Sequence, residues 1–64
     1  MNHADFDRRV LDSLRAGLSS ARAIGEALGV NAAAVKNSLM RLESRTLAVH
    51  LGAFWKALPV RGEA

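Results

Sequence analysis

The chain of 64 residues contains no cysteine and no tyrosine, one proline and one tryptophan. Without cysteine, it can form neither a disulfide nor a thiolate metal site. Half of the residues are hydrophobic, yet no apolar run approaches the roughly 20 residues that a membrane span needs. The first residues, MNHADFDRRVLDSL, carry three aspartates, which argues against a signal or transit peptide. We therefore expect a cytoplasmic protein with no membrane partner.

Side chains suited to enzymatic chemistry are also scarce. The only histidines are His3 and His50, and no motif of paired carboxylates accompanies them. A Ser-His-Asp arrangement needs a preformed pocket, for which so small a domain has little interior. Two histidines at this separation also make no recognisable metal site. The sequence therefore predicts a protein that is not an enzyme and has no cofactor, metal or small-molecule ligand.

Charge of one sign is only in modest excess. Nine Lys and Arg residues against six Asp and Glu residues give a net charge of +3 and an isoelectric point near 10.7. This balance permits a polyanionic partner without requiring one. With so modest a net charge, eight or more phosphate contacts are out of reach of one copy, so a DNA-binding function would favour a homodimer.

The first two thirds of the chain show three helical patterns with apolar residues at helical spacing. The helices are predicted over residues 5–15, 21–28 and 32 to about 44. Asn2 or Asp5 could cap the start of the first. Ser20 and Asn31 are good N-caps for the second and third, and Gly29 ends the second. The apolar stripes consist of Phe6, Val10, Leu11 and Leu14, then Ile24 and Leu28, then Val35, Leu39 and Leu42.

After residue 46 the periodicity becomes alternating, which indicates strands. We expect a hairpin with strands over residues 47–50 and 54–58 and a turn at Gly52. Leu47, Val49 and Leu51 would share one face, and Ala48 and His50 the other. Two registers remain possible, one burying the aromatic residue at position 54 and the other that at position 55. The proline at position 59 should stop the second strand, leaving residues 59–64 as a flexible tail.

The order helix, helix, Gly-Val turn, helix and hairpin resembles that of winged helix-turn-helix DNA-binding domains. The likeness covers residues 6–58, within a single domain expected over residues 1–58. Gly25 would cost about 1 kcal/mol relative to Ala in the middle of a helix, and in this superfamily a small residue there lets two helices cross closely. The residues that carry the resemblance are Ser20, Ile24, Gly25, Leu28, Gly29, Val30, Val35, Leu39, Leu42 and Leu47. It implies a fold that is mainly α with a small β-hairpin, the wing.

Two positions depart from the superfamily's pattern. Winged members often have glycine where this chain has Thr46, because the third helix ends there with a positive φ, which a β-branched residue resists. The recognition helix also normally opens with polar side chains. Here it opens with three alanines, at positions 32–34.

The resemblance implies that the third helix enters the major groove of double-stranded DNA and that the hairpin lies along the backbone. At about 100° per residue, the face opposite the apolar stripe holds Ala33, Asn37, Met40, Arg41 and Ser44, with Lys36 beside it. Asn can bond adenine with two hydrogen bonds, Arg can do the same with guanine, and an alanine methyl can pack on a thymine methyl. The candidate DNA contacts are Arg22, Asn31, Ala33, Lys36, Asn37, Met40, Arg41, His50 and Lys56.

The leading hypothesis is therefore a small bacterial or phage transcriptional regulator that binds duplex DNA at specific sequences. The alternative is a winged-helix module that binds another protein, with Met40 and the alanine run as its contact surface. Binding to DNA would weaken steeply with salt, whereas apolar contact would not.

Overall fold

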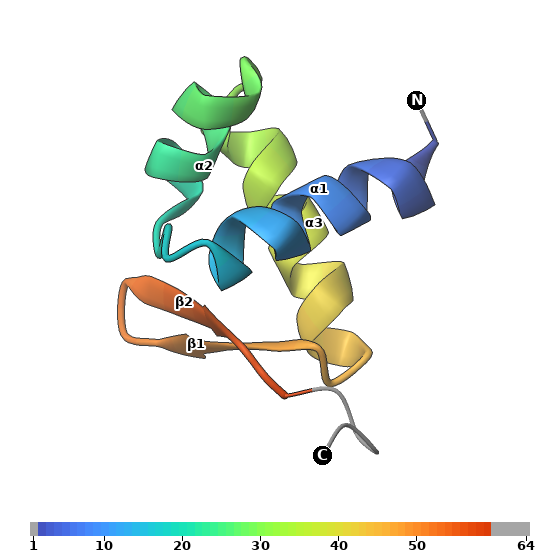
Figure 1. Cartoon of the computed structure of the whole chain (residues 1–64), viewed down its shortest axis with the longest axis vertical. Helices are drawn as coiled ribbons and strands as arrows, with labels where there is room; N and C mark the ends of the chain where they lie inside the picture. The colour runs from blue at the N-terminus through green and yellow to red at the C-terminus, as the bar shows by residue number, and fades with distance from the viewer. Residues whose placement is uncertain (1, 60–64) are drawn as a thin grey trace.

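The structure is a computed structural model that describes residues 2–59 (Figure 1). Its elements are α1 (His3–Arg15), α2 (Ala21–Leu28), α3 (Ala32–Ser44), β1 (Ala48–Leu51) and β2 (Phe54–Ala57). Three helices and one antiparallel hairpin form a mainly helical, winged-helix-like layout, as predicted. In Figure 1, α1 crosses in front of α3, and the hairpin lies below α1 and α2. Of the tail predicted over residues 59–64, residues 60–64 lie outside the described part of the chain.

Local capping explains where the helices begin and end. The Ser20 hydroxyl accepts from the Ala23 amide at 3.1 Å, and the Asn31 side chain accepts from the Ala34 amide at 2.8 Å. The bounds of α2 and α3 agree with the prediction. Of the two candidate caps of the first helix, Asn2 is the one used. Its side chain accepts from the Asp5 amide at 2.9 Å, so α1 begins at His3, two residues before the predicted start.

The three predicted apolar stripes meet in one core. Most of their members are buried, and Ala48 of the hairpin joins them. The buried hydrophobic residues are Val10, Leu11, Leu14, Ile24, Val35, Leu39, Leu42 and Ala48. Phe6 and Leu28 are only partly buried and lie against the edge of this core.

Gly25 lies within α2, on the side that packs against the turn between α2 and α3. A Cβ at this position would lie 2.7 Å from the Val30 carbonyl oxygen and 3.5 Å from the Ala32 amide nitrogen. The close approach inferred from the sequence is therefore present, but the neighbour is the backbone of the turn and the start of α3. Gly29 ends α2 with a φ of 73°, a conformation that glycine adopts without strain. The Val30 side chain is 37% exposed and does not fill the turn as a core residue would.

The backbone at the end of α3 has the positive φ that was expected at Thr46. This residue has a φ of 60°, the left-handed conformation that a β-branched residue resists. Its amide donates to the Glu43 carbonyl at 2.9 Å, and the Leu47 amide donates to the Leu42 carbonyl at 2.9 Å. The chain therefore makes the reversal that the superfamily makes with glycine, with Thr46 held in an unfavourable backbone conformation.

The hairpin pairs Ala48 with Ala57, Val49 with Lys56, His50 with Trp55 and Leu51 with Phe54. This register decides between the two that the sequence left open. Trp55 lies against the core, whereas Phe54 is 59% exposed. The strands are also displaced slightly from their predicted bounds, since β1 begins at Ala48 and β2 ends at Ala57.

The hairpin is attached to the helices along both of its edges. On the β2 side, the Trp55 amide donates to the Ser19 carbonyl at 2.7 Å, which ties the strand to the loop between α1 and α2. On the β1 side, the His50 amide donates weakly to the Glu43 carboxylate of α3 at 3.4 Å. The hairpin is therefore held against the body of the domain beside the outer face of α3.

Candidate nucleic-acid interface

The outer face of α3 is open to solvent along its first three turns. Ala33, Lys36, Asn37 and Met40 are all exposed, as the helical periodicity predicted. The Met40 side chain is 54% exposed, which is high for a residue of this size and polarity. The face combines small, amide, thioether and cationic side chains, and no other described element covers it.

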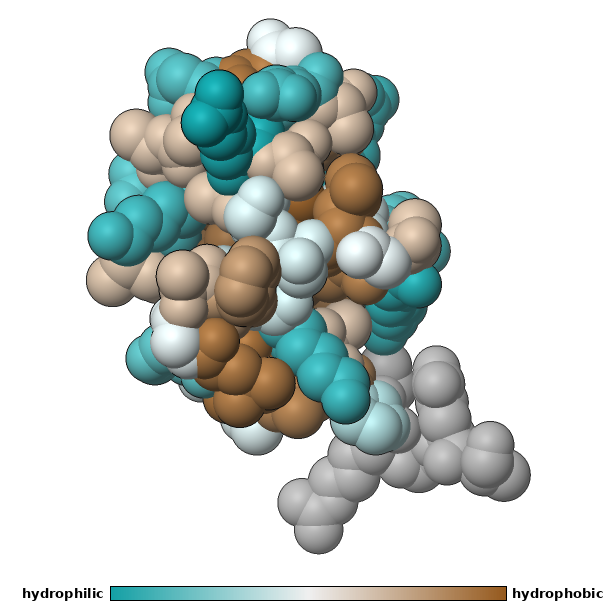
Figure 2. Space-filling model, turned by 90° about the vertical axis from the view of Figure 1, so that its left-hand side faces the viewer, coloured by the Kyte–Doolittle hydropathy of each residue, from teal (hydrophilic) through white to brown (hydrophobic). Residues whose placement is uncertain are grey.

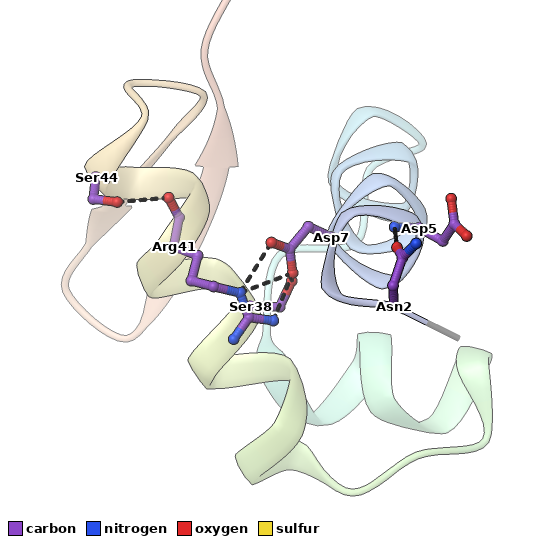
Figure 3. Close-up of polar contacts among 6 residues, drawn as sticks. All are labelled: Asn2, Asp5, Asp7, Ser38, Arg41 and Ser44. Atoms are coloured by element: carbon purple, nitrogen blue, oxygen red, sulfur yellow. Dashed lines mark hydrogen bonds and ion pairs between the residues drawn. The ribbon is translucent and has the colours of Figure 1, made fainter.

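Arg41 is the predicted contact whose surroundings the sequence did not reveal. Its guanidinium reaches from α3 to α1 and binds the carboxylate of Asp7 (Figure 3). The Nη2 group donates to Asp7 Oδ1 at 2.7 Å, and Nε donates to Oδ2 at 3.0 Å. The Ser38 hydroxyl donates to the same Oδ1 at 2.6 Å. These three residues form the Asp7 cluster, which joins α1 to α3.

The Asp7 cluster is largely shielded from water. The side chain of Asp7 is only 7% exposed and that of Arg41 is 35% exposed, while Ser38 is fully buried. The hydrogen bonds from Arg41, followed by that from Ser38, hold the pKa of Asp7 below its ordinary value against the opposing effect of burial. The same hydrogen bond raises the pKa of Arg41. Both side chains are therefore charged at neutral pH.

Asp7 was not predicted from the sequence as a site residue, although a signal was present. Position 7 lies beside Phe6 and one turn before Val10 and Leu11, so it falls on the apolar stripe of α1. A charged residue on a core-facing stripe is almost never buried without a partner. That rule points to a buried ion pair, but it does not identify Arg41 as the partner.

A cleft of about 470 Å³ separates the outer face of α3 from the hairpin. Lys36, Met40 and Glu43 line it from α3, and His50 and Trp55 from the strands. The start of α2 and the turn of the hairpin close its ends. The open face of α3 therefore continues into a groove bordered by the hairpin.

Inside this cleft His50 is turned toward α3. Its Nδ1 lies 2.6 Å from Glu43 Oε2, and its ring is 5.2 Å from that of Trp55 at an interplanar angle of 53°. The predicted wing contact thus has a carboxylate partner within the molecule. This contact connects β1 with α3.

The other two predicted cationic contacts differ in availability. Lys56 is exposed, and its pairing with Val49 places it on the hairpin face opposite His50. Arg22, near the start of α2, lies 3.4 Å from Glu26, but both side chains are more than two thirds exposed. Such an exposed pair contributes little energy and can open to meet another anion.

The outward face of the hairpin is more apolar than a wing that tracks phosphates would require. Leu51 is 60% exposed and its cross-strand neighbour Phe54 is 59% exposed. Figure 2 shows a brown, hydrophobic patch on the lower part of the molecule, at the level of the hairpin. Lys56 is the one cation of the two strands.

Comparison of the chain with family models, curated proteins and solved structures gives no match. Within residues 2–59, no three potential metal ligands come together. No helix of this part of the chain is long and apolar enough to cross a membrane.

Proposed function

We propose that the protein belongs to the winged helix-turn-helix superfamily and binds double-stranded DNA at specific sequences, as a small transcriptional regulator does. The observation that carries this proposal is the open outer face of α3, which presents Asn37 and Lys36 beside small side chains. A duplex major groove is about 12 Å wide and admits one α-helix. The fold leaves α3 uncovered on the side that such a docking would use.

The side chains of this face suit close approach to base edges. Because Ala33 and its neighbours are short, the helix axis can come nearer to the bases than a helix with long side chains could. The amide of Asn37 can donate to adenine N7 and accept from the adenine N6 amino group in the major groove, and the Ala33 methyl can pack on a thymine methyl. Lys36, which borders the cleft, supplies a charge for a flanking phosphate.

The hairpin contributes less charge than a typical wing. Lys56 is exposed for a phosphate contact, whereas His50 reaches DNA only if it leaves Glu43. The small cationic surface of one copy supports the expectation that two copies bind adjacent half-sites. In helix-turn-helix dimers such half-sites lie about one helical turn of DNA apart.

The test is an NMR titration of the chain with a mixed-sequence duplex at about 50 mM salt or below. We expect the amides of residues 31–41 and 48–56 to shift and those of residues 6–15 to move little. Raising the salt should reverse the shifts, because phosphate binding releases counterions. Shifts confined to α1, or none at low salt, would reject DNA binding.

Two variants sharpen this titration. Lys36→Ala should weaken binding to all sequences alike and reduce the salt slope by about one unit. Asn37→Ala should weaken a preferred site by about 1–3 kcal/mol and leave scrambled DNA less affected. Arg9→Ala on the exposed face of α1 removes the same charge as Lys36→Ala away from the interface, so it is the matched control and should change little.

One observation favours a second function, the binding of another protein. Leu51, Phe54 and Met40 are large hydrophobic side chains that are each more than half exposed. Exposed apolar side chains of this kind mark protein contacts when they form a continuous patch. Binding that persists at high salt and is lost in Phe54→Ser, with no response to any duplex, would favour this function over DNA binding.

A further inference from the structure

The guanidinium of Arg41 has two edges that can each donate a pair of parallel hydrogen bonds. Asp7 takes the edge formed by Nε and Nη2. The second donor pair, at the end of the guanidinium, consists of Nη1 and the second hydrogen of Nη2, and within residues 2–59 Asp7 is the one hydrogen-bond partner of the Arg41 side chain. In Figure 3 a terminal nitrogen of Arg41 lies on the side away from the Asp7 carboxylate. One complete donor pair therefore remains free.

The free edge lies beside the outer face of α3. A hollow of about 300 Å³ is lined there by Ala34, Asn37 and Arg41 of α3 together with His3 and Phe6 of α1. Asn37 precedes Arg41 by one helical turn, so both side chains line this hollow. The Arg41 side chain is 35% exposed, which leaves its outer atoms accessible to a ligand.

Asp7 holds this arginine in position before any ligand arrives. An arginine in solution loses rotamer freedom when it binds, and a preformed geometry reduces that loss. The carboxylate is itself fixed by the buried Ser38 hydroxyl at 2.6 Å. The ion pair also neutralises the negative charge of Asp7, which would otherwise repel a nucleic acid.

We propose that Arg41 reads a guanine in the bound duplex through its free edge and that Asp7 is the positioning residue for this contact. The proposal rests on the duplex binding proposed above and names one base that it recognises. Guanine presents two acceptors, N7 and O6, in the major groove, which match two parallel donors. Adenine presents one acceptor and one donor at the same place, so the Arg41 edge discriminates against it.

A purely structural role for the Asp7 cluster would join α1 to α3 without affecting base preference. A phosphate contact by Arg41 would weaken binding to every sequence alike. Both alternatives differ from guanine reading in one measurable respect: neither depends on the N7 atom of a particular guanine.

The experiment begins with selection of a preferred site by the full chain from a pool of random duplexes at low salt. Each guanine of that site is then replaced in turn by 7-deazaguanine, which keeps base pairing but lacks the N7 acceptor. Dissociation constants are measured for the wild type, Arg41→Lys, Asp7→Asn and the control Lys36→Ala. Amide spectra of each variant report whether it is folded.

At one guanine we expect the deaza substitution to weaken wild-type binding by about 5- to 10-fold, the loss of one of two hydrogen bonds. Arg41→Lys keeps the charge and the partner Asp7 but loses the fork, so it should bind both duplexes equally. Asp7→Asn should reduce the sensitivity to N7, because the arginine is held less firmly. Lys36→Ala should bind more weakly but keep the full sensitivity of the wild type.

The inference is overturned if the wild type is insensitive to deaza substitution at every guanine, or if Arg41→Lys keeps the wild-type sensitivity. In either case the duplex binding itself would stand, since the affinities are still measured. Absence of binding to any duplex would instead reject the proposed function and this contact with it. If Asp7→Asn is unfolded, Arg41→Lys alone decides the role of the arginine, and Asp7→Glu tests the need for a carboxylate.

Discussion

Replacing Asp7 by alanine should destabilise the domain more than any other single change of a charged residue that the structure describes. The carboxylate accepts from the buried Ser38 hydroxyl at 2.6 Å and from Arg41 at 2.7 and 3.0 Å. Its loss leaves the Ser38 hydroxyl at 0% exposure without this acceptor. An unsatisfied buried polar group costs about 1–3 kcal/mol.

The contribution of Arg41 to this cost is smaller than that of a fully buried partner. Removing one member of a fully buried ion pair costs about 3–5 kcal/mol. Because 35% of the Arg41 side chain is exposed, the released guanidinium can turn into water and recover much of its hydration. We therefore expect a total loss of about 2–3 kcal/mol. In a domain of this size that corresponds to a fall in melting temperature of roughly 10–20 °C.

Urea denaturation followed by circular dichroism measures this change, with Asp12→Ala as the matched control. Asp12 lies on the same helix, but its partner Arg8 is 3.6 Å away and both side chains are more than half exposed. Such a pair contributes about 0–1 kcal/mol. If Asp7→Ala loses no more stability than Asp12→Ala, the Asp7 cluster does not hold α1 to α3. A Ser38→Ala change in the Asp7→Ala background should recover part of the loss, because it removes the orphaned hydroxyl.

Three further outcomes follow from the same structure. Gly25→Ala should lower the free energy of unfolding by about 1–3 kcal/mol because its Cβ would lie 2.7 Å from the Val30 carbonyl oxygen; an unchanged denaturation midpoint would contradict that clash. Thr46→Gly should raise it by about 0.5–1 kcal/mol by relieving the φ of 60°, and a loss of stability would show that the conformation is not strained. The folded state lowers the pKa of Asp7, so this stabilisation is complete above the ordinary carboxyl pKa of about 4 and is lost as pH falls through the folded value. Urea midpoints should therefore fall more steeply in acid for the wild type than for Asp7→Ala, and equal slopes would contradict this account.

The helices could be predicted from the sequence because their signals are local. Ser20 and Asn31 cap helices through hydrogen bonds to amides three residues away, and Gly29 supplies the left-handed end of α2. The apolar stripes follow helical spacing, which also predicted the open outer face of α3. Even the small residue at position 25 pointed correctly to a close backbone approach, which involves both the turn and the first residue of α3.

The hairpin register could not be predicted in the same way. Either register alternates apolar and polar residues equally well along four-residue strands, so period-2 patterning does not separate them. The choice comes from outside the hairpin, where Ala48 enters the core and the Trp55 amide bonds to Ser19 at 2.7 Å. Those contacts leave Leu51 and Phe54 facing outward, so the exposed face of the hairpin is apolar rather than basic.

Periodicity determined which faces of the helices are apolar, and capping residues determined where α2 and α3 begin and where α2 ends, because those properties depend on residues a few positions apart. The tertiary structure decided which polar side chains near the site have a partner within the molecule. Asp7 and Arg41 are 34 residues apart and meet only when α1 packs on α3, and Glu43 meets His50 only when β1 folds back. Whether these side chains pair depends on their distance in space, which spacing along the chain does not encode.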